Sequence, residues 1–232
     1  MKFDSNIIEH FSRSEDVLSV RFQRPKGFNF TPGQFIFLHL DKPDESLVKH
    51  FTISSSPSED YLEITKKLTG HPFSNALLAL QIGDTVSLDG PYGEFTNTGE
   101  NQKLLFITGG IGITPIRSMI RYSVDMKTND DMVLLYSCKT EDSILFREEL
   151  DEIREEHRKL SVIYTLTQPQ GKWNGVRGRI DGEMIRKHIP DYSSRVSYIS
   201  GPPGMVESLV NVLINELNVP SEQIKKEQFL GL

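Results

Sequence analysis

The sequence has very little cysteine, no long hydrophobic run and no excess of positive charge. Its 232 residues include one cysteine and one tryptophan. The single cysteine, Cys138, excludes an internal disulfide, and a cysteine-ligated iron–sulfur cluster would have to lie on another polypeptide because it normally needs four thiolates. No segment approaches the roughly 20 apolar residues of a membrane span, and the N-terminal segment lacks the apolar core of a signal peptide. We therefore expect a cytoplasmic protein without a membrane span.

The charge pattern and the histidine spacing argue against a nucleic-acid partner and a metal site. The formal net charge of −6 comes from 26 basic and 32 acidic residues, which are interspersed along the chain without a basic stripe. Nucleic acid is therefore not an expected partner. None of the six histidines has a spacing suited to a metal site, so no metal is expected.

The first part of the chain, residues 1–98, has the pattern of several short strands with little helix. Turn residues such as Pro32-Gly33 and Gly90-Pro91 separate runs rich in β-branched and aromatic residues. This texture predicts a small antiparallel β-barrel with one short helix over 74–80. The predicted strands cover residues 17–22, 34–40, 50–54, 61–65 and 85–90.

The second part, residues 99–232, alternates apolar runs with helical patterns. That alternation predicts an α/β domain with a parallel, Rossmann-like sheet and crossover helices. Its predicted strands cover residues 104–107, 132–136, 160–166 and 196–199, with helices beginning near Glu141 and spanning 206–217. The length of the chain also favours two domains, and we expect their boundary near residue 98.

Two strand–glycine–helix junctions occur in the second part, at Gly109–Pro115 and Ser200–Met205. In the first, we expect Thr114 to accept a hydrogen bond from a free backbone amide of the helix, and Pro115 suits the first helical turn. Free amides at a helix terminus bind phosphate, whereas a tight turn without a ligand is the alternative interpretation. Neither junction fits the G-x-G-x-x-G spacing, so that motif gives no support.

Six short motifs, in order across both parts, make the pattern specific. The second part has GGIGITP at Gly109–Pro115, SGPPGM at Ser200–Met205 and EQF at Glu227–Phe229. The first part has FTPGQF from Phe30, KHFTISS from Lys49 and GPYGEF from Gly90. Together they resemble the ferredoxin–NADP reductase family over roughly residues 17–229. The resemblance implies a flavin-binding barrel at 1–98 and an NAD(P)-binding α/β domain at 99–232.

The resemblance also implies how the barrel would bind the flavin. In the motif of Lys49, His50, Phe51 and Thr52, Lys49 would meet the phosphates, Phe51 would stack on the isoalloxazine and the Thr52 hydroxyl would point toward N5. Lysine replaces the family's usual arginine, and the following G-x-x-S motif has one extra residue, so FAD is expected but FMN stays an alternative. Further flavin contacts would come from Ile64, Thr65, Lys66, Gly70, Ser74 and Asn75.

The nicotinamide coenzyme would bind to the second part. Its contacts would come from the two glycine junctions, which supply Gly110, Gly112, Thr114, Pro115, Gly201, Pro202 and Met205. Ser200 replaces a cysteine often found there and would lie near the nicotinamide. Lys139 offers a charge to a 2′-phosphate while Glu141 and Asp142 offer carboxylates to a ribose. NADPH and NADH therefore both remain expected donors.

At the end of the chain, the resemblance implies that Glu227 assists the active site and that Phe229 covers the second face of the flavin. The alternative is a final strand with Phe229 in the core. Thr52, Ser200, Glu227 and Phe229 are thus the predicted catalytic residues. We expect a reductase that takes hydride from NAD(P)H and passes electrons to a separate ferredoxin, flavodoxin or oxygenase component. Reduction of free flavin or ferric complexes, or service as an electron-transfer subunit of a larger complex, are the alternatives.

Overall fold

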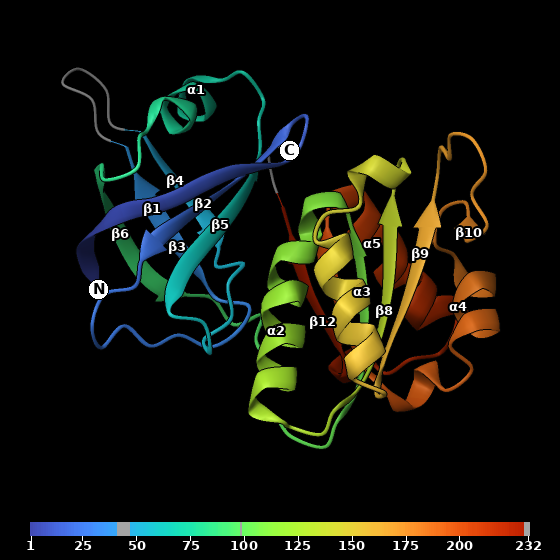
Figure 1. Ribbon diagram of the computed structural model, residues 1–232. Coiled ribbons are helices and arrows are strands. Elements are labelled where there is room, and N and C mark those ends of the chain that lie inside the picture. Colours follow the sequence, from blue (N-terminus) through green and yellow to red (C-terminus); the bar gives the residue numbers. More distant parts are fainter. Residues whose placement is uncertain (41–46, 98, 230–232) are drawn as a thin grey trace. The chain divides into compact units, whose positions relative to one another are not determined.

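The computed structural model describes residues 1–40, 47–97 and 99–229, which form two compact units (Figure 1). One unit consists of residues 1–98 together with 117–122, and the other of 99–116 together with 123–232. The boundary predicted at residue 98 falls on a position outside the described residues. No helix in the described part of the chain is long and apolar enough to cross a membrane.

The first unit is built on a six-stranded antiparallel sheet with the order β4-β3-β6-β1-β2-β5. Just beyond β4, the Ser54 N–H donates to the carbonyl of Glu63 in β5 over 2.7 Å, so the two outermost strands approach each other. This arrangement confirms the predicted antiparallel barrel. The strands are β1 (Lys2–Ser14), β2 (Val17–Gln23), β3 (Phe35–His39), β4 (Val48–Thr52), β5 (Tyr61–Lys67) and β6 (Thr85–Tyr92).

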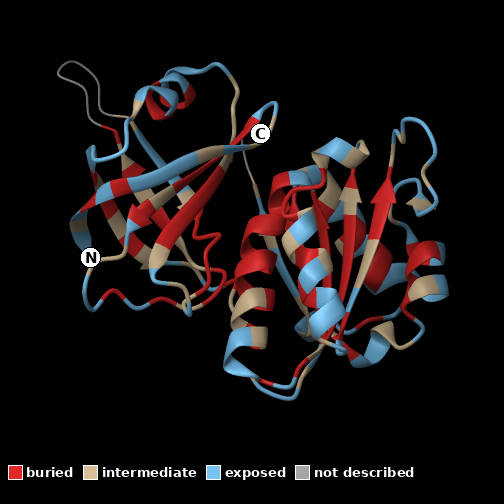
Figure 2. Cartoon of the chain, in the orientation of Figure 1, coloured by how far each residue is buried: buried red, intermediate tan, exposed pale blue. Residues whose placement is uncertain are grey.

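The core of this unit comes from alternate strand residues such as Val20, Phe22, Ile36 and Leu38, and Figure 2 shows buried segments along its strands. Helix α1 (Pro72–Ala79) adds Phe73 and Leu77 to the same core. The predicted helix over 74–80 is therefore present but begins two residues earlier, at a proline that suits a first helical turn.

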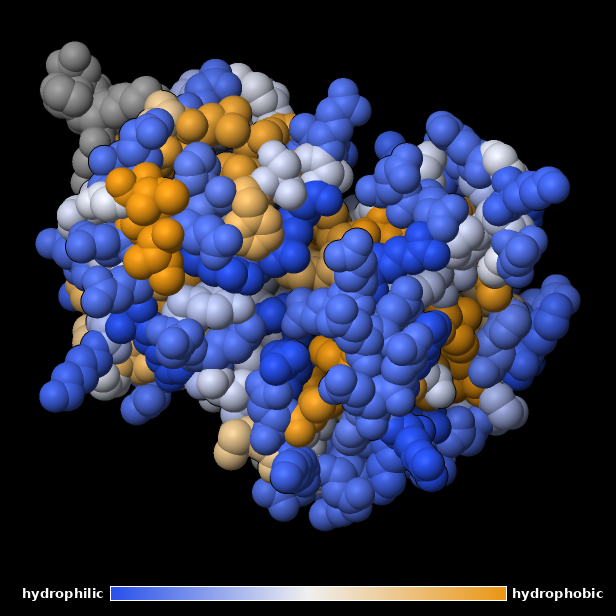
Figure 3. Space-filling view, in the orientation of Figure 1, coloured by the Kyte–Doolittle hydropathy of each residue, from blue (hydrophilic) through white to orange (hydrophobic). Residues whose placement is uncertain are grey.

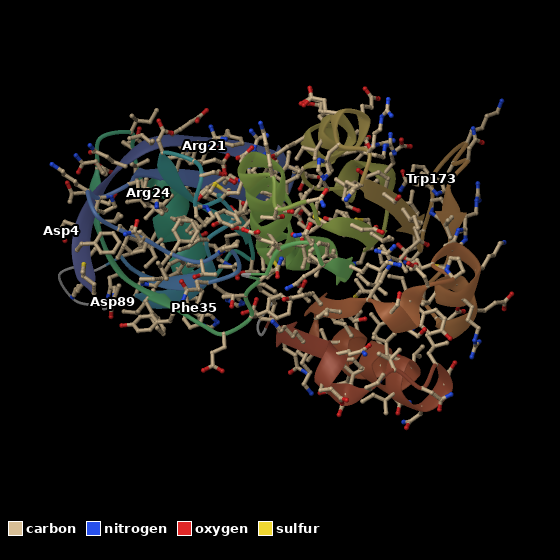
Figure 4. All side chains as sticks on the ribbon, turned by 90° about the horizontal axis from the view of Figure 1, so that it is seen from below. Asp4, Arg21, Arg24, Phe35, Asp89 and Trp173 are labelled. Atoms are coloured by element: carbon tan, nitrogen blue, oxygen red, sulfur yellow. The ribbon has the colours of Figure 1, made fainter. Side chains whose placement is uncertain are left out.

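The buried Glu63 carboxylate of the first unit is paired with arginines. The Glu63 side chain is inaccessible to solvent and accepts hydrogen bonds from Arg13 at 3.1 Å, from Arg21 at 2.9 Å and from the Ser54 hydroxyl at 3.0 Å. Arg21, labelled in Figure 4, also stacks on the Tyr61 ring with its guanidinium carbon 4.3 Å from the ring centroid. These contacts tie β1, β2 and β5 together by charge as well as by backbone pairing.

Residues 117–122 of helix α2 (Ile113–Met126) belong to this same unit. Arg117 forms a two-pronged ion pair with Glu59, in which one N–O distance is 2.8 Å, and donates to the Ser54 carbonyl at 3.0 Å. The Ser118 hydroxyl donates to the Ser55 carbonyl at 2.6 Å. The second half of α2 is therefore fastened to the β4–β5 connection.

The second unit is built on a six-stranded parallel sheet with the order β10-β9-β8-β7-β11-β12, which confirms the predicted α/β class. Its strands are β7 (Lys103–Gly109), β8 (Asp131–Cys138), β9 (Leu160–Leu166), β10 (Val176–Arg177), β11 (Val196–Gly201) and β12 (Ile224–Gln228). The chain adds β8, β9 and β10 on one side of β7 and then returns to add β11 and β12 on the other. Strand order thus reverses between β7 and β11.

Helices cover both faces of this sheet. Helices α4 (Gly182–His188) and α5 (Pro203–Asn211) pack on one face through residues such as Ile185 and Leu209. Helix α3 (Arg147–Glu156) lies on the other face in Figure 1. The helix predicted from Glu141 is wrong at its start, because a 3₁₀ turn at Glu141–Ser143 and the buried Phe146 precede α3. The helix predicted over 206–217 begins earlier and ends in a π-helical stretch at Val212–Glu216.

Candidate functional site

The two glycine junctions lie at the carboxyl ends of neighbouring strands. Strand β7 ends at Gly109 and leads through a 3₁₀ turn, Gly110–Gly112, into α2. Strand β11 ends at Gly201 and leads into α5. Because Thr108 of β7 pairs with Ser200 of β11, both junctions meet where the strand order reverses. This edge of an open parallel sheet is where ligands bind.

The glycines at this edge allow the two junctions to approach each other closely. A Cβ added to Gly112 would lie 2.6 Å from the Ser200 carbonyl oxygen, and one added to Gly109 would collide with the Met205 sulfur. Gly110 has φ +53°, and a Cβ on it would meet no atom of the described residues within 4 Å. A ligand can therefore approach the Gly110 Cα closely, which suits binding of a phosphate at this turn.

The predicted capping role of Thr114 is wrong. Helix α2 is preceded by Gly112 and has no side-chain cap, and the Thr114 hydroxyl instead donates to the Ile111 carbonyl at 3.2 Å. The Ile113 N–H is not free to donate to a capping side chain, because it already donates to the carbonyls of Gly110 and Ile111 in the preceding 3₁₀ turn. Pro115 lies in the first turn of α2, as expected.

Ser200 is inaccessible to solvent and fully hydrogen-bonded. Its hydroxyl donates to the Gly112 carbonyl at 2.7 Å and lies 3.2 Å from the Thr108 hydroxyl, which itself donates to the Ser200 carbonyl at 3.0 Å. The Ser200 side chain therefore holds the two junctions together. Its predicted place beside the nicotinamide stays a prediction.

Glu227 carries the unsatisfied polar atom of this edge. Its carboxyl Oε2 is buried without a hydrogen-bond partner among the described residues. Burial raises the pKa of Glu227 to about 7, far above the ordinary range of a glutamate. Strand β12 places Glu227 directly opposite Ser200. A buried carboxyl oxygen without a described partner is a group that a polar ligand would satisfy.

Phe229 follows β12 directly and is tied to the second junction, since its N–H donates to the Gly201 carbonyl at 3.0 Å. The final strand of the alternative interpretation thus exists, as the outer strand β12. The Phe229 ring is half-buried and stands outside the apolar cluster that α4 and α5 form on the sheet. Its predicted stacking on the flavin stays a prediction.

Two lysines of the first unit form a local concentration of positive charge. Lys49 lies on β4 and Lys66 on β5, and the pKa of Lys66 is lowered by burial and then by the neighbouring Lys49 charge. The Lys66 ammonium donates to the Lys67 carbonyl at 2.9 Å, and neither lysine has an ion pair with another described residue. Two like charges held together fit an anionic group such as a phosphate.

The loop before α1 holds three of the predicted flavin contacts. Gly70 has φ +70°, and a Cβ on it would meet no described atom within 4 Å. The Asn75 amide donates to the Gly70 carbonyl at 3.0 Å, and the Ser74 hydroxyl accepts from the Thr69 N–H at 3.3 Å. These bonds shape the loop, and Gly70 leaves its backbone accessible to a ligand.

The remaining predicted flavin contacts differ in where they point. Phe51 is half-buried, with its ring centroid 5.4 Å from that of Phe73, and Thr52 is buried. Ile64 faces the apolar core, whereas Thr65 is buried on the opposite face of β5, where its hydroxyl bonds to Ser19 at 2.8 Å. These two residues can therefore meet a ligand only through their backbone.

His50 lies on the opposite face of β4 from Lys49 and Phe51, because successive strand residues alternate. Its exposed ring contacts Phe35, labelled in Figure 4, at a centroid distance of 5.4 Å. Of the motif that begins at Lys49, the structure thus places Lys49 and Phe51 together and His50 apart from them.

The loops after β8 and β9 leave the choice of coenzyme open. Lys139 is exposed, and the Glu141 carboxylate is paired with Arg147 at 2.5 Å. The Trp173 indole, labelled in Figure 4, donates to the Val176 carbonyl at 2.8 Å and folds its own loop. Pro202 is exposed and Met205 is half-buried at the second junction, as a ligand contact requires.

Sequence reasoning missed Tyr136. This tyrosine is inaccessible to solvent, and its hydroxyl donates to the Gly110 carbonyl at 2.8 Å. A tyrosine at the end of the otherwise apolar run from Met132 was the available signal, because a buried tyrosine hydroxyl needs a hydrogen-bond partner.

Comparisons with known proteins agree with this site. The chain matches a family model for an oxidoreductase FAD-binding domain over residues 4–97 and one for an oxidoreductase NAD-binding domain over residues 106–211. It is similar to ferredoxin–NADP reductase B of Sorangium cellulosum, with 26% identity over 242 residues that cover 98% of this chain and 97% of that protein.

A second relative is longer. The glycine betaine monooxygenase reductase subunit of Chromohalobacter salexigens is 34% identical over 197 residues, which cover 82% of this chain and 54% of that protein. The chain thus spans about half the length of this monooxygenase reductase subunit.

Solved structures show the same fold. The ferredoxin reductase in carbazole 1,9a-dioxygenase has a TM-score of 0.83 and 25% identity, over 99% of this chain and 70% of that one. A ferredoxin–NADP⁺ reductase from Neisseria gonorrhoeae has a TM-score of 0.83 and 20% identity, over 98% of each chain, and its similarity concerns the fold.

The antiparallel sheet, the parallel sheet and the two matched models define a two-domain protein of the oxidoreductase class, with an FAD-binding and an NAD-binding domain. The chain belongs to the ferredoxin–NADP reductase family, as the six sequence motifs indicated.

Proposed function

We propose that this protein takes hydride from NADH or NADPH onto a bound flavin, FAD in the first instance, and passes electrons on to a separate acceptor protein. In this proposal residues 1–98 bind the flavin and residues 99–232 bind the nicotinamide coenzyme. The flavin supplies the chemistry, since it accepts two electrons as hydride and releases them singly. We place this activity in the cytoplasm as part of the same proposal.

One observation carries the proposal for the coenzyme. The open backbone at Gly110, the junction at Gly201 and the unpartnered Glu227 carboxyl converge at the edge where strand order reverses. The amides of the 3₁₀ turn would bind the pyrophosphate, and Ser200 would keep the two junctions in register. Glu227, with its pKa near 7, would hold a proton that a bound carboxamide or water can share.

The first unit supports flavin binding through its lysines. Lys49 and Lys66 would neutralise the flavin phosphates, and the Gly70 backbone would allow them to approach the start of α1. Phe51 presents a half-buried ring beside Lys49 on the same face of β4, which suits contact with a flat aromatic ligand.

The proposed acceptor is the oxygenase component of a multicomponent system. Two relatives support this choice, since they are named the reductase subunit of a glycine betaine monooxygenase and the reductase component of a propane 2-monooxygenase. A ferredoxin or flavodoxin is the other form of acceptor that the proposal accommodates.

The test is an anaerobic titration of the purified, flavin-loaded protein with NADH and, separately, with NADPH. The flavin absorbance is expected to bleach with at least one of them, and the ratio of the two rate constants identifies the donor. If neither NADH nor NADPH bleaches the flavin, the proposal is overturned. Saturable reduction of added free flavin, without saturation by any acceptor protein, would favour a free-flavin reductase instead.

A further inference from the structure

Tyr136 connects two loops that follow neighbouring strands of the parallel sheet. Its hydroxyl donates to the carbonyl of Gly110 at 2.8 Å and accepts the N–H of Leu145 at 3.3 Å. Gly110 follows β7, whereas Leu145 follows β8 and precedes α3. One buried oxygen thus bridges the first glycine junction and the loop that carries Lys139.

Each loop has a residue with positive φ close to this oxygen. Gly110 has φ +53°, and Phe146, which follows Leu145, has φ +58°. A left-handed conformation is uncommon for a bulky residue and persists only where the surroundings determine it. The Tyr136 hydroxyl anchors the backbone at the first position and beside the second.

The surroundings leave the Tyr136 hydroxyl little freedom. A hydroxyl has one proton to donate, and this one is used on Gly110, whose carbonyl also accepts from the Ile113 N–H at the start of α2. The neighbouring Cys138 thiol is buried, and burial raises its pKa to about 12, so the thiol stays neutral. The Tyr164 ring lies alongside, with centroids 6.3 Å apart.

We propose that Tyr136 is a positioning residue for coenzyme binding, which holds the Gly110–Gly112 turn open to a pyrophosphate and couples it to the loop after β8. Tyr136 acts through Gly110 and Leu145, without touching the coenzyme. The assignment rests on the proposed function, because it requires that the turn bind a dinucleotide. It predicts that loss of the hydroxyl weakens coenzyme binding more than it affects the later electron-transfer steps.

The test compares Tyr136→Phe with Tyr198→Phe. Both tyrosines are inaccessible to solvent in the same sheet, but the Tyr198 hydroxyl accepts from Lys225, away from the glycine junctions. The probe is NAD⁺ or NADP⁺, whichever matches the reduced coenzyme that bleaches the wild-type flavin. Flavin content and melting temperature are recorded for each variant.

For Tyr136→Phe, the Kd of the oxidised coenzyme and the KM of the reduced one are expected to rise about 3- to 10-fold, the range for losing the hydrogen bond that holds the Gly110 carbonyl. The limiting rate of flavin bleaching is expected to stay within about twofold. Tyr198→Phe is expected to change neither constant. Equal Kd values for the two variants would overturn the assignment and leave the proposed function intact. The same holds if Tyr136→Phe loses as much in kcat as it loses in kcat/KM.

A measurement on the wild-type protein keeps the proposal testable if Tyr136→Phe does not fold. Amide hydrogen exchange is followed with and without the oxidised coenzyme. Exchange is expected to slow at Gly110–Gly112 and at the Leu145 N–H together. Slowing at the glycines with no change at Leu145 would refute the coupling. No coenzyme binding by the wild-type protein would overturn both this inference and the proposed function.

Discussion

Glu227 and Ser200 lie opposite each other at the carboxyl ends of β12 and β11, yet their side chains differ in whether they are hydrogen-bonded within the protein. The Ser200 hydroxyl is bonded within the protein, whereas Glu227 Oε2 is buried without a described partner. The site therefore has one fixed polar group and one that is available to a ligand.

The first prediction concerns the pH dependence of stability. Burial raises the pKa of Glu227 from 4.5 to about 7. Between these values the unfolded chain releases a proton that the folded protein keeps, so stability is lost as pH rises through this window and stays lower above it. Glu227→Gln is expected to remove this loss, which is on the order of 3 kcal/mol at pH 8.

The measurement is urea unfolding of wild type and Glu227→Gln at several pH values from 4 to 8. The exposed Glu222, replaced by Gln, is the control, because it removes a carboxylate from the surface of the same unit. Parallel stability curves for wild type and Glu227→Gln would contradict the prediction.

The second prediction concerns Phe229. If its ring covers the flavin, the nicotinamide has to displace it, so Phe229→Ala is expected to tighten coenzyme binding. Stacked aromatic pairs contribute about 0.5–1.5 kcal/mol, which corresponds to a 2- to 10-fold lower Kd. The measurement is the coenzyme Kd at unchanged flavin content.

Tyr192→Ala is the matched control, since Tyr192 is a half-buried aromatic of the same unit that precedes the amino end of β11. This variant is expected to leave the coenzyme Kd unchanged. Loss of folding in Phe229→Ala, without any change in coenzyme affinity of the folded fraction, would instead assign the ring to the core.

The third prediction concerns the flavin phosphates. Lys49→Ala is expected to raise the flavin Kd about 10- to 100-fold, because a charged hydrogen bond to phosphate contributes roughly 1.5–3 kcal/mol. Lys49→Arg is expected to bind at least as tightly as wild type, since a guanidinium forms two parallel bonds. Fluorescence of released flavin measures both constants.

Lys67→Ala serves as the control for Lys49, because Lys67 lies one residue from Lys66 and pairs with Asp16 at 3.4 Å. It is expected to keep wild-type flavin affinity. If Lys67→Ala and Lys49→Ala weaken flavin binding equally, the effect is one of overall charge and the phosphate assignment for Lys49 is wrong.

The fourth prediction concerns acid stability of the first unit. Burial pushes the pKa of Glu59 upward, but hydrogen bonds and charge from Arg117 outweigh it and leave the pKa lowered. Such a carboxylate stabilises the fold above its unfolded pKa, and this stability is lost as pH falls below that value. Glu59→Gln is expected to cost about 1–3 kcal/mol at pH 7.

Chemical unfolding at pH 7 and at pH 3 measures the effect. The difference between wild type and Glu59→Gln is expected to shrink at the lower pH, because the unfolded wild-type chain takes up a proton on Glu59 below its ordinary pKa and the ion pair then contributes less to stability. Exposed Glu15, replaced by Gln, is the control and is expected to change little at either pH. A constant difference at both pH values would show that the ion pair is not its source.

The sequence revealed the strands that form nearly continuous apolar runs. The run Leu160–Leu166 was predicted with the bounds that the structure shows. The first strand, Lys2–Ser14, was missed because most of its side chains are exposed or half-buried and two bulges interrupt its pairing with β2. Helix α4 was also missed, although Asp181 accepts the Met184 N–H and is a capping signal that was available.

The site was predictable where it depends on backbone geometry. Glycine spacing located both junctions, because close approach excludes any side chain at Gly112. Side-chain hydrogen bonding was less predictable. Thr114 bonds backward to Ile111, and the hydroxyls of Ser200 and Tyr136 are used inside the fold. The partners of Ser200 and Tyr136 come from other segments of the sheet, which no local pattern encodes, and the bond of Thr114 depends on the 3₁₀ turn that precedes it.

The central place of β7 has a consequence for synthesis on the ribosome. Its first neighbour, β8, follows within the next 30 residues, but β11 begins only at Val196. The ribosome adds about 5–20 residues per second, so the second edge of β7 stays unpaired for on the order of 5–15 seconds before β11 is synthesised. During that time the apolar run Leu104–Ile107 presents an open edge to other nascent chains. A chaperone that shields this segment is therefore expected to raise the yield of folded protein.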